Sequence, residues 1–136
     1  MAKSVIVDAG FLVALIVAGD THHGWATSTA LEHRRPWHTC EPALTEAFFL
    51  LRLQHWPRLA GLMRRESLRV TLELRTHQSA VLTLMERYAN VPMSLAHACL
   101  VRMTEILPEP VLLTTDTDFR IYRRHGRQVV PCALPS

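Results

Sequence analysis

The sequence predicts an α/β fold with a mostly parallel central sheet that helices cover on both faces. Short apolar runs rich in Val, Ile and Leu recur along the chain, and longer segments with apolar residues at helical spacing separate them. Strands that alternate with helices are joined by right-handed crossovers, which makes the strands parallel and puts helices over the sheet. The 136 residues fit one domain, expected to span 1–136.

The first two elements are a strand and a helix. Residues 3–8 form a short apolar run that is typical of a buried strand, and residues 11–15 open a helix. Thr21 or Asp20 is expected to cap a second helix, which ends near Arg34.

The middle of the chain is expected to hold a strand followed by two separate helices. Residues 36–40 fit a short strand, and Pro42 fits the first turn of an apolar helix that reaches about His55. Residues 57–66 predict a further helix, because their apolar side chains recur at helical spacing.

The second half of the chain continues the alternation. Residues 68–72 alternate between apolar and polar side chains with a period of two, as a strand does. The remaining expected elements are helices at about 76–89 and 94–107, a buried strand at 111–115, a short helix or turn at 118–125 and a last strand at 128–132.

Composition narrows the class of protein. The hydrophobic fraction of 49% is that of an ordinary globular protein. The sequence begins without a secretory signal pattern and contains no apolar stretch of membrane-spanning length, so we expect a cytoplasmic protein with no membrane partner. Cys40, Cys99 and Cys132 are odd in number and lack Cys-x-x-Cys spacing, which predicts buried thiols rather than disulfides or a zinc site.

Positive charge comes almost entirely from arginine. The formal net charge is +3 and the pI is about 9.1, a balance that mildly favours a polyanionic partner. The arginines gather in three local groups, which either contact phosphates or form solvated helix faces: Arg34 and Arg35; Arg64, Arg65 and Arg69; and Arg120, Arg123, Arg124 and Arg127.

A single carboxylate interrupts each of three apolar runs. Asp8 and Asp116 each end a predicted strand, and Glu46 lies within the predicted apolar helix. A buried charge costs several kcal/mol unless it is paired or coordinates a cation, and no Lys or Arg lies within these runs. Each acid alone fits a solvated rim. The three together indicate a metal site at the carboxyl ends of the strands, where parallel sheets bind ligands.

Four segments resemble the motif blocks of the PIN domain, in the same order and with fitting intervals. The four segments are 5–15, 44–47, 92–98 and 113–122. The chain most resembles the small single-domain members, including the VapC-like toxins of toxin–antitoxin pairs, and the likeness covers essentially the whole chain. It implies a three-layer α/β/α sandwich and a divalent-metal-dependent endoribonuclease that uses Mg²⁺ or Mn²⁺. It also implies RNA as substrate, a homodimer, and an antitoxin protein as a partner.

The resemblance also assigns roles to single residues. Asp8 matches the first acid of the family, Glu46 the second and Asp116 the fourth, so these three are the predicted metal ligands. Asp118 is an auxiliary acid in the same loop as Asp116. With His97, which occupies the third position, they make up the predicted catalytic residues.

The third position departs from the family pattern. His97 stands where the family usually has Asp, and Ser94 stands where close relatives often carry another. The remaining acids support one hydrated hard cation well and a second poorly. His97 is either a metal ligand, a general acid or base, or the N3 residue of a helix capped by Ser94, where its imidazole only forms hydrogen bonds.

Three functions follow from these observations. The favoured one is an active metal-dependent endoribonuclease. The second is a degenerate PIN domain that binds RNA or a partner protein without cleavage, and the third is an unrelated metal-dependent phosphohydrolase acting on small substrates, which the order of the blocks disfavours. Apolar side chains at 44–53 and 57–63 exceed what one sheet face requires and favour a twofold homodimer.

Overall fold

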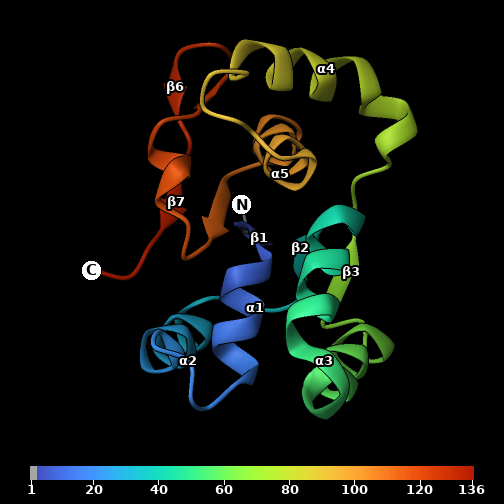
Figure 1. Ribbon diagram of the computed structural model, residues 1–136, viewed down its shortest axis with the longest axis vertical. Coiled ribbons are helices and arrows are strands. Elements are labelled where there is room, and N and C mark those ends of the chain that lie inside the picture. The colour runs from blue at the N-terminus through green and yellow to red at the C-terminus, as the bar shows by residue number, and fades with distance from the viewer. Residues whose placement is uncertain (1–2) are drawn as a thin grey trace.

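The computed structural model of this chain describes residues 3–136. The helices are α1 (Ala9–Ile16), α2 (His23–Glu32), α3 (Glu41–Arg64), α4 (Leu74–Arg87) and α5 (Leu95–Ile106), with the 3₁₀ helix η1 (Thr117–Arg120). The strands are β1 (Ser4–Val7), β2 (Trp37–Thr39), β3 (Leu68–Val70), β4 (Pro110–Leu113), β5 (Arg123–Arg124), β6 (Gln128–Val129) and β7 (Cys132–Ala133). Figure 1 shows their arrangement.

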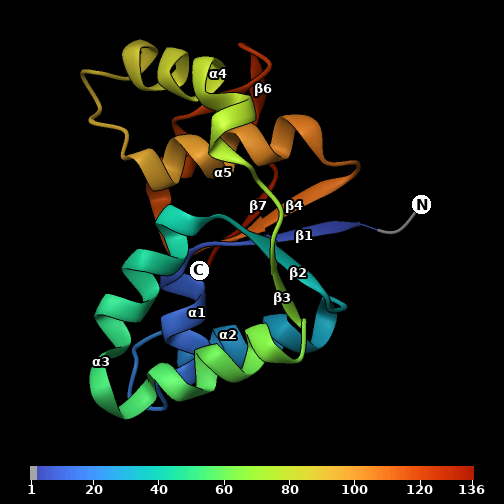
Figure 2. The same cartoon turned by 90° about the vertical axis from the view of Figure 1, so that its right-hand side faces the viewer.

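The fold is a three-layer α/β/α sandwich around a parallel sheet, as predicted. Its five strands follow the order β3-β2-β1-β4-β7, and every neighbouring pair is parallel. Helices α4 and α5 cover one face, and α1, α2 and α3 cover the other (Figure 2). Both faces of the sheet are therefore buried, which explains why its strands have nearly continuous apolar sequences.

Strand β1 shows how the core divides between the two layers. Val5 and Val7 pack with Phe11 and the residues of α1, α2 and α3, whereas Ile6 packs with residues of α4 and α5. All three side chains are nearly or fully buried. Successive side chains of a strand point to opposite faces, so one short strand anchors both helical layers.

The chain changes direction at β1, and this places the candidate site. From β1 it passes to β2 and β3 on one side, then crosses back to β4 and β7 on the other. Val7 lies opposite Leu113 in the register of β1 and β4, so Asp8 and Thr114 leave the sheet next to each other. Carboxyl ends of strands at such a reversal form the usual crevice for ligands in α/β folds.

Helix α3 contains two helical parts, as predicted, but the boundary between them lies elsewhere. It runs from Glu41 to Arg64 with a break at Arg52, whose φ of 55° and ψ of −159° are not helical. The expected boundary at Pro57 is therefore wrong. Pro57 lies inside the second part of α3, where it removes one backbone donor without ending the helix, and the chain breaks one turn earlier.

Two other predicted boundaries are wrong. Neither Asp20 nor Thr21 caps α2, whose N-cap is His22; the Asp20 carboxylate instead accepts a hydrogen bond from the His22 amide at 2.9 Å and closes the preceding turn. The expected strand 128–132 divides in two. β6 pairs antiparallel with β5, and β7 joins β4 in the main sheet. Pro131 lies between them and donates no backbone hydrogen bond, so the ladder does not continue through it.

Two of the three cysteines are buried, as the sequence predicts for all three. Cys40 and Cys99 are buried free thiols as predicted, whereas Cys132 is only partly buried.

Across residues 3–136, none of the helices combines the length and the apolar character that crossing a bilayer requires.

Candidate metal centre

Asp8 forms the buried base of the candidate site. It follows β1 directly and caps α1, because its Oδ1 accepts a hydrogen bond from the Ala9 amide at 2.7 Å. Its Oδ2 accepts a second one from the Thr114 hydroxyl at 2.9 Å. Only 4% of Asp8 is exposed. The carboxylate is therefore fixed in position by the start of α1 and by the segment after β4.

Thr114 connects Asp8 to Asp116 through hydrogen bonds. Its hydroxyl oxygen accepts a hydrogen bond from the Asp116 amide at 3.0 Å while donating to Asp8. Asp116 in turn caps η1, since its Oδ1 accepts from the Asp118 amide at 2.9 Å. One hydroxyl and one capped turn therefore set the positions of the Asp8 and Asp116 carboxylates and of the Asp118 backbone.

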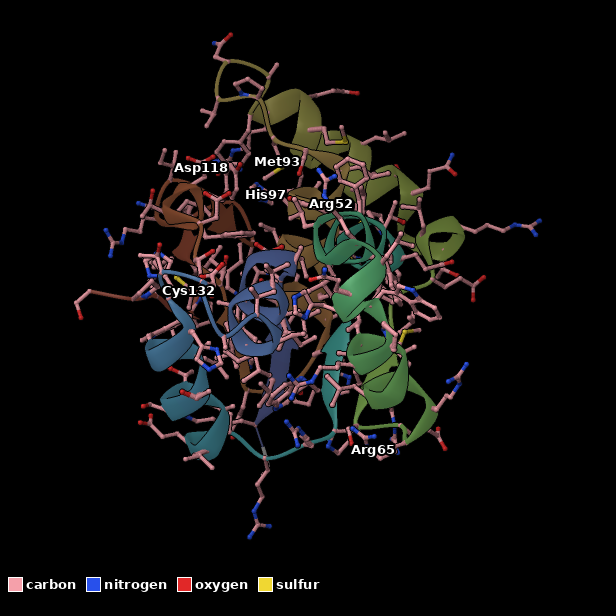
Figure 3. The ribbon with its side chains drawn as sticks, turned by 60° about the horizontal axis from the view of Figure 1, so that its bottom comes forward. Arg52, Arg65, Met93, His97, Asp118 and Cys132 are labelled. Carbon is pink, nitrogen blue, oxygen red and sulfur yellow. The ribbon has the colours of Figure 1, made fainter. Side chains whose placement is uncertain are left out.

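His97 approaches the same acids from the other helical layer. Ser94 caps α5 and accepts a hydrogen bond from the His97 amide at 3.0 Å, which confirms the predicted N3 position. The His97 Nε2 lies 3.1 Å from Asp116 Oδ2, and its Nδ1 lies 3.1 Å from the Tyr122 hydroxyl. The imidazole also packs on Phe119, with ring centroids 4.6 Å apart. Figure 3 shows His97 and Asp118 at the same end of the molecule.

Gly10 permits a close approach between α1 and the loop that carries Asp116. A Cβ atom at this position would lie 2.3 Å from the Thr115 Oγ1. Glycine inside a helix costs roughly 0.5–1 kcal/mol relative to alanine. Gly10 lies in the first turn of α1, at the point where Thr115 packs against the helix, and Thr115 directly precedes Asp116.

Burial controls the electrostatics of the site. It raises the pKa of Asp8 above its usual range, although nearby His97 and the hydrogen bonds from Thr114 and Ala9 oppose that shift. Burial also raises the pKa of Tyr122 to about 12, with the surrounding carboxylates adding to the effect. Tyr122 therefore stays protonated well above neutral pH, and its hydroxyl either donates to the His97 Nδ1 or accepts from it, depending on the tautomer of His97. No Lys or Arg of residues 3–136 forms an ion pair with Asp8.

Three side chains of the site come close enough to share one cation. His97, Asp116 and Asp118 each offer one ligand atom, and the three atoms lie within 4.8 Å of one another. Such a set of two carboxylate oxygens and one imidazole nitrogen fits a single divalent ion, and the nitrogen favours Mn²⁺ over Mg²⁺. The buried charge of Asp8 beside them adds a further reason for a cation.

This set differs from the predicted one. The sequence predicted Asp8, Glu46 and Asp116 as ligands, and of these only Asp116 belongs to the group. Glu46 lies on α3 with an exposed side chain, yet it is close enough for its charge to raise the pKa of Asp8. Asp8 and Glu46 therefore place negative charge around the group, while Asp118 and His97 each offer one atom that could bind a cation.

The chain matches no family model and, at a significant level, no curated protein sequence. The roles of these residues consequently rest on their own geometry.

Two residues of the site were not predicted as functional. Thr114 orients both Asp8 and Asp116 through its hydroxyl, a role that a threonine at the end of a strand does not reveal in the sequence. Tyr122 was missed altogether. The available signal was its spacing of four from Asp118, since such spacing places two side chains on one face of a helical turn.

Proposed function

We propose that this protein is a divalent-metal-dependent endoribonuclease of the PIN-domain type, with RNA as substrate and Mg²⁺ or Mn²⁺ as cofactor. The observation that carries the proposal is the convergence of Asp8, Asp116, Asp118 and His97 at the carboxyl edge of the sheet. Hard divalent cations select such clusters, and they leave coordination positions open for a phosphate.

Some residues of the site would bind the cation, and others hold the side chains of the site in position. Asp116, Asp118 and His97 would hold the ion, which supplies an activated water and stabilises charge on the phosphate when bound. Thr114 keeps Asp8 and Asp116 in place. With the Nε2 lone pair directed at a cation, the His97 proton resides on Nδ1 and is donated to the Tyr122 oxygen, which fixes the ring.

A second function is favoured by the contact between His97 and Asp116. At 3.1 Å, the His97 Nε2–H can satisfy one Asp116 oxygen without any metal. A PIN-like domain in which this pair persists would bind RNA or a partner protein without cutting. The two functions differ in whether a divalent cation displaces the His97–Asp116 contact.

A cleavage assay separates the two functions. We expect purified protein to cut structured RNA with Mn²⁺ or Mg²⁺, to be inactive in EDTA, and to lose at least about 100-fold in rate in Asp116→Asn, since about 2.7 kcal/mol of transition-state stabilisation is a usual loss when one stabilising group is removed. Glu86→Gln is the matched control, because Glu86 is an exposed carboxylate on α4 and does not belong to the group of His97, Asp116 and Asp118. RNA binding without cleavage under all metal conditions would instead establish the binding function.

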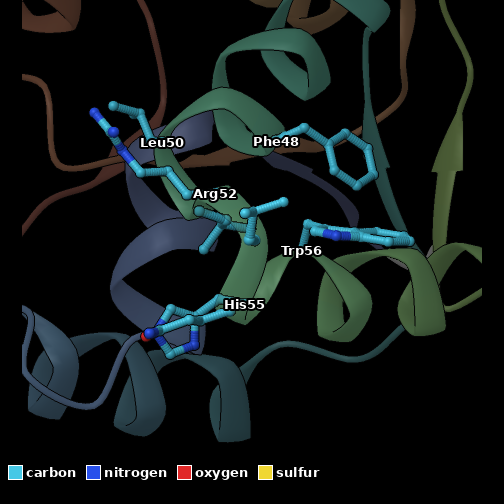
Figure 4. Close-up of a pocket in the computed structure, with 8 residues that line it drawn as sticks. Phe48, Leu50, Arg52, His55 and Trp56 are labelled. Atoms are coloured by element: carbon cyan, nitrogen blue, oxygen red, sulfur yellow. The ribbon is translucent and has the colours of Figure 1, made fainter.

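We also propose a twofold homodimer formed through α3. Phe49, Leu50, Leu53 and Trp56 are all large apolar side chains with 41% or more of their surface exposed. They surround the break at Arg52, where a hollow of about 780 Å³ opens (Figure 4). Apolar surface of this kind is typical of association sites.

The proposal extends to the cellular role. A toxin of an antitoxin-regulated pair, acting on cytoplasmic RNA, is the role that agrees with a small nuclease domain of this type. A short upstream reading frame for a DNA-binding antitoxin would support this role. Its absence would favour a ribonuclease that acts without a dedicated inhibitor.

A further inference from the structure

A polar hollow, separate from the apolar one at the break in α3, lies at the far end of α1 from the acids. It has a volume of about 600 Å³ and lies between the end of α1, the start of α2 and the second part of α3. Asp8 caps the other end of α1, about 12 Å away for eight helical residues. Arg65, at the end of α3, is at the opposite end of the view from Asp118 in Figure 3.

Three arginines line this hollow, and their charge is not neutralised. Arg35, Arg58 and Arg65 line it together with His23 and Thr27, and no carboxylate does. Among residues 3–136, none of the three guanidinium groups forms an ion pair. Like charges gathered in a concave surface repel one another and raise the local concentration of anions.

Structural roles account for only part of this cluster. Arg58 donates to the Ile16 carbonyl at 3.4 Å and so supports the end of α1. Arg35 stacks on the Trp37 ring at 4.6 Å, which leaves the edge of its guanidinium group free to donate hydrogen bonds. Arg65 lies over Gly61, where a Cβ would be 3.2 Å from its Nη1, so the absence of a side chain there makes room for the guanidinium group.

The fold selects one arginine from each of two Arg-Arg pairs. Arg35 and Arg65 line the hollow, whereas their sequence neighbours Arg34 and Arg64 do not. Two distant parts of the sequence therefore contribute guanidinium groups to the same hollow, and guanidinium groups are the donors best suited to phosphate oxygens.

We propose that this hollow binds backbone phosphates of the RNA substrate, outside the nucleotides that occupy the acidic cluster. The identity of the occupant rests on the proposed function, whereas the anion site rests on the arginines alone. The hollow and the cluster lie at opposite ends of α1, so only an RNA long enough to span both occupies the two sites at once. Binding of long RNA then depends on Arg35 and Arg65, and binding of a short oligonucleotide at the acidic cluster does not.

Matched double variants test this. Arg35→Gln/Arg65→Gln and Arg34→Gln/Arg64→Gln remove the same charge from adjacent positions, and Arg35→Lys/Arg65→Lys keeps the charge. Binding of a labelled RNA hairpin is measured by fluorescence anisotropy in EDTA between about 50 and 200 mM salt. Thermal unfolding of each variant is recorded alongside to confirm that the fold is retained.

We expect Arg35→Gln/Arg65→Gln to weaken hairpin binding about tenfold and to reduce the salt slope by between about one and two, as expected for two lost phosphate contacts. Arg34→Gln/Arg64→Gln should change affinity less than about twofold, and the lysine pair should recover most of it. An equal loss of hairpin affinity in both glutamine pairs overturns the proposal. So does a result in which pyrophosphate binding depends on Arg35 and Arg65 while hairpin binding does not.

Cleavage is scored separately on a short oligonucleotide with Mn²⁺. If hairpin affinity does not depend on Arg35 and Arg65 while cleavage is normal, this inference is overturned and the proposed nuclease function still stands. Hairpin binding that requires Arg35 and Arg65, without cleavage under any metal condition, overturns the nuclease and supports the hollow.

Discussion

At the scale of single residues, the site is built around a carboxylate that the fold removes from water. Asp8 accepts hydrogen bonds from Ala9 and Thr114, but no Lys or Arg of residues 3–136 forms an ion pair with it. A buried charge with this little compensation is destabilising. Proteins keep such residues where the charge has a function, and a bound cation would supply the missing compensation.

The first prediction concerns the cost of this charge. Burial raises the pKa of Asp8 above its ordinary 3.8, so the folded protein holds the proton more tightly than the unfolded chain does. Stability from the protonated carboxyl is complete below the ordinary pKa and is lost as the pH rises through the folded pKa. An amide does not ionise. In EDTA near neutral pH, we therefore expect Asp8→Asn to raise the free energy of unfolding by about 1 kcal/mol or more.

Urea unfolding across pH checks this. The gain in Asp8→Asn should shrink towards zero as the pH falls below the ordinary pKa of Asp8, 3.8. Glu86→Gln, which removes an exposed carboxylate on α4, should stay within about 0.5 kcal/mol of wild type throughout. A wild type that is more stable than Asp8→Asn near neutral pH would show that the carboxylate is compensated in some other way.

The second prediction concerns the choice of metal. His97 supplies the one nitrogen of the cation-sized group, and oxygen ligands suit Mg²⁺ better than imidazole does. We expect His97→Asp to tighten Mg²⁺ binding on the order of tenfold, to raise cleavage with Mg²⁺, and to narrow the preference for Mn²⁺. Calorimetry and side-by-side cleavage assays of wild type, His97→Asp and His97→Ala measure this. Two inactive variants beside an active wild type would make His97 itself catalytic.

At the scale of elements, α3 is the helix whose shape differs most from the sequence-based prediction. Pro57 marks an expected boundary, because proline breaks most helices, but the break occurs at Arg52. A φ of 55° at an arginine is a strained conformation, which persists only where surrounding structure enforces it. Local sequence cannot reveal such a break, because it depends on how both parts of α3 pack on their neighbours.

The third prediction tests association through α3. Leu53 is 87% exposed beside the break, and Leu31 on α2 is 90% exposed elsewhere. We expect light scattering at micromolar concentration to give a dimer for wild type and for Leu31→Glu, and a monomer for Leu53→Glu, because a charge buried in an apolar interface is costly. A wild-type monomer, or a Leu53→Glu dimer, would remove α3 as the interface.

At the scale of the whole molecule, the site is a product of topology. Asp8 follows β1, Asp116 and Asp118 follow β4, and His97 begins α5. Parallel pairing of β1 with β4 brings the first two segments together, and α5 packs on the same two strands from one face. Asp8 and Asp116 were predictable as site residues, because each follows an apolar strand. Which of the predicted side chains lie within 4.8 Å of one another was not predictable, because rotamers and turn geometry decide how close Glu46 and Asp118 come to Asp116.

The overall sandwich was predictable for a related reason. Buried strands such as Val5–Val7 and helices at regular spacing are visible in one sequence, and parallel order follows from their alternation. The short strands at the carboxyl end were not distinguishable, because β5, β6 and β7 are two residues each and only their partners tell them apart.

Calorimetric titration of Mn²⁺ into the protein tests the central claim most directly, namely that the carboxyl edge of the sheet is a divalent-cation site. We expect one site in wild type and in Glu86→Gln. Asp116→Asn should weaken it by about tenfold or more, and Asp8→Asn by less, because Asp116 supplies a ligand atom and Asp8 supplies charge nearby. Equal Mn²⁺ affinity in wild type, Asp8→Asn and Asp116→Asn would contradict the account.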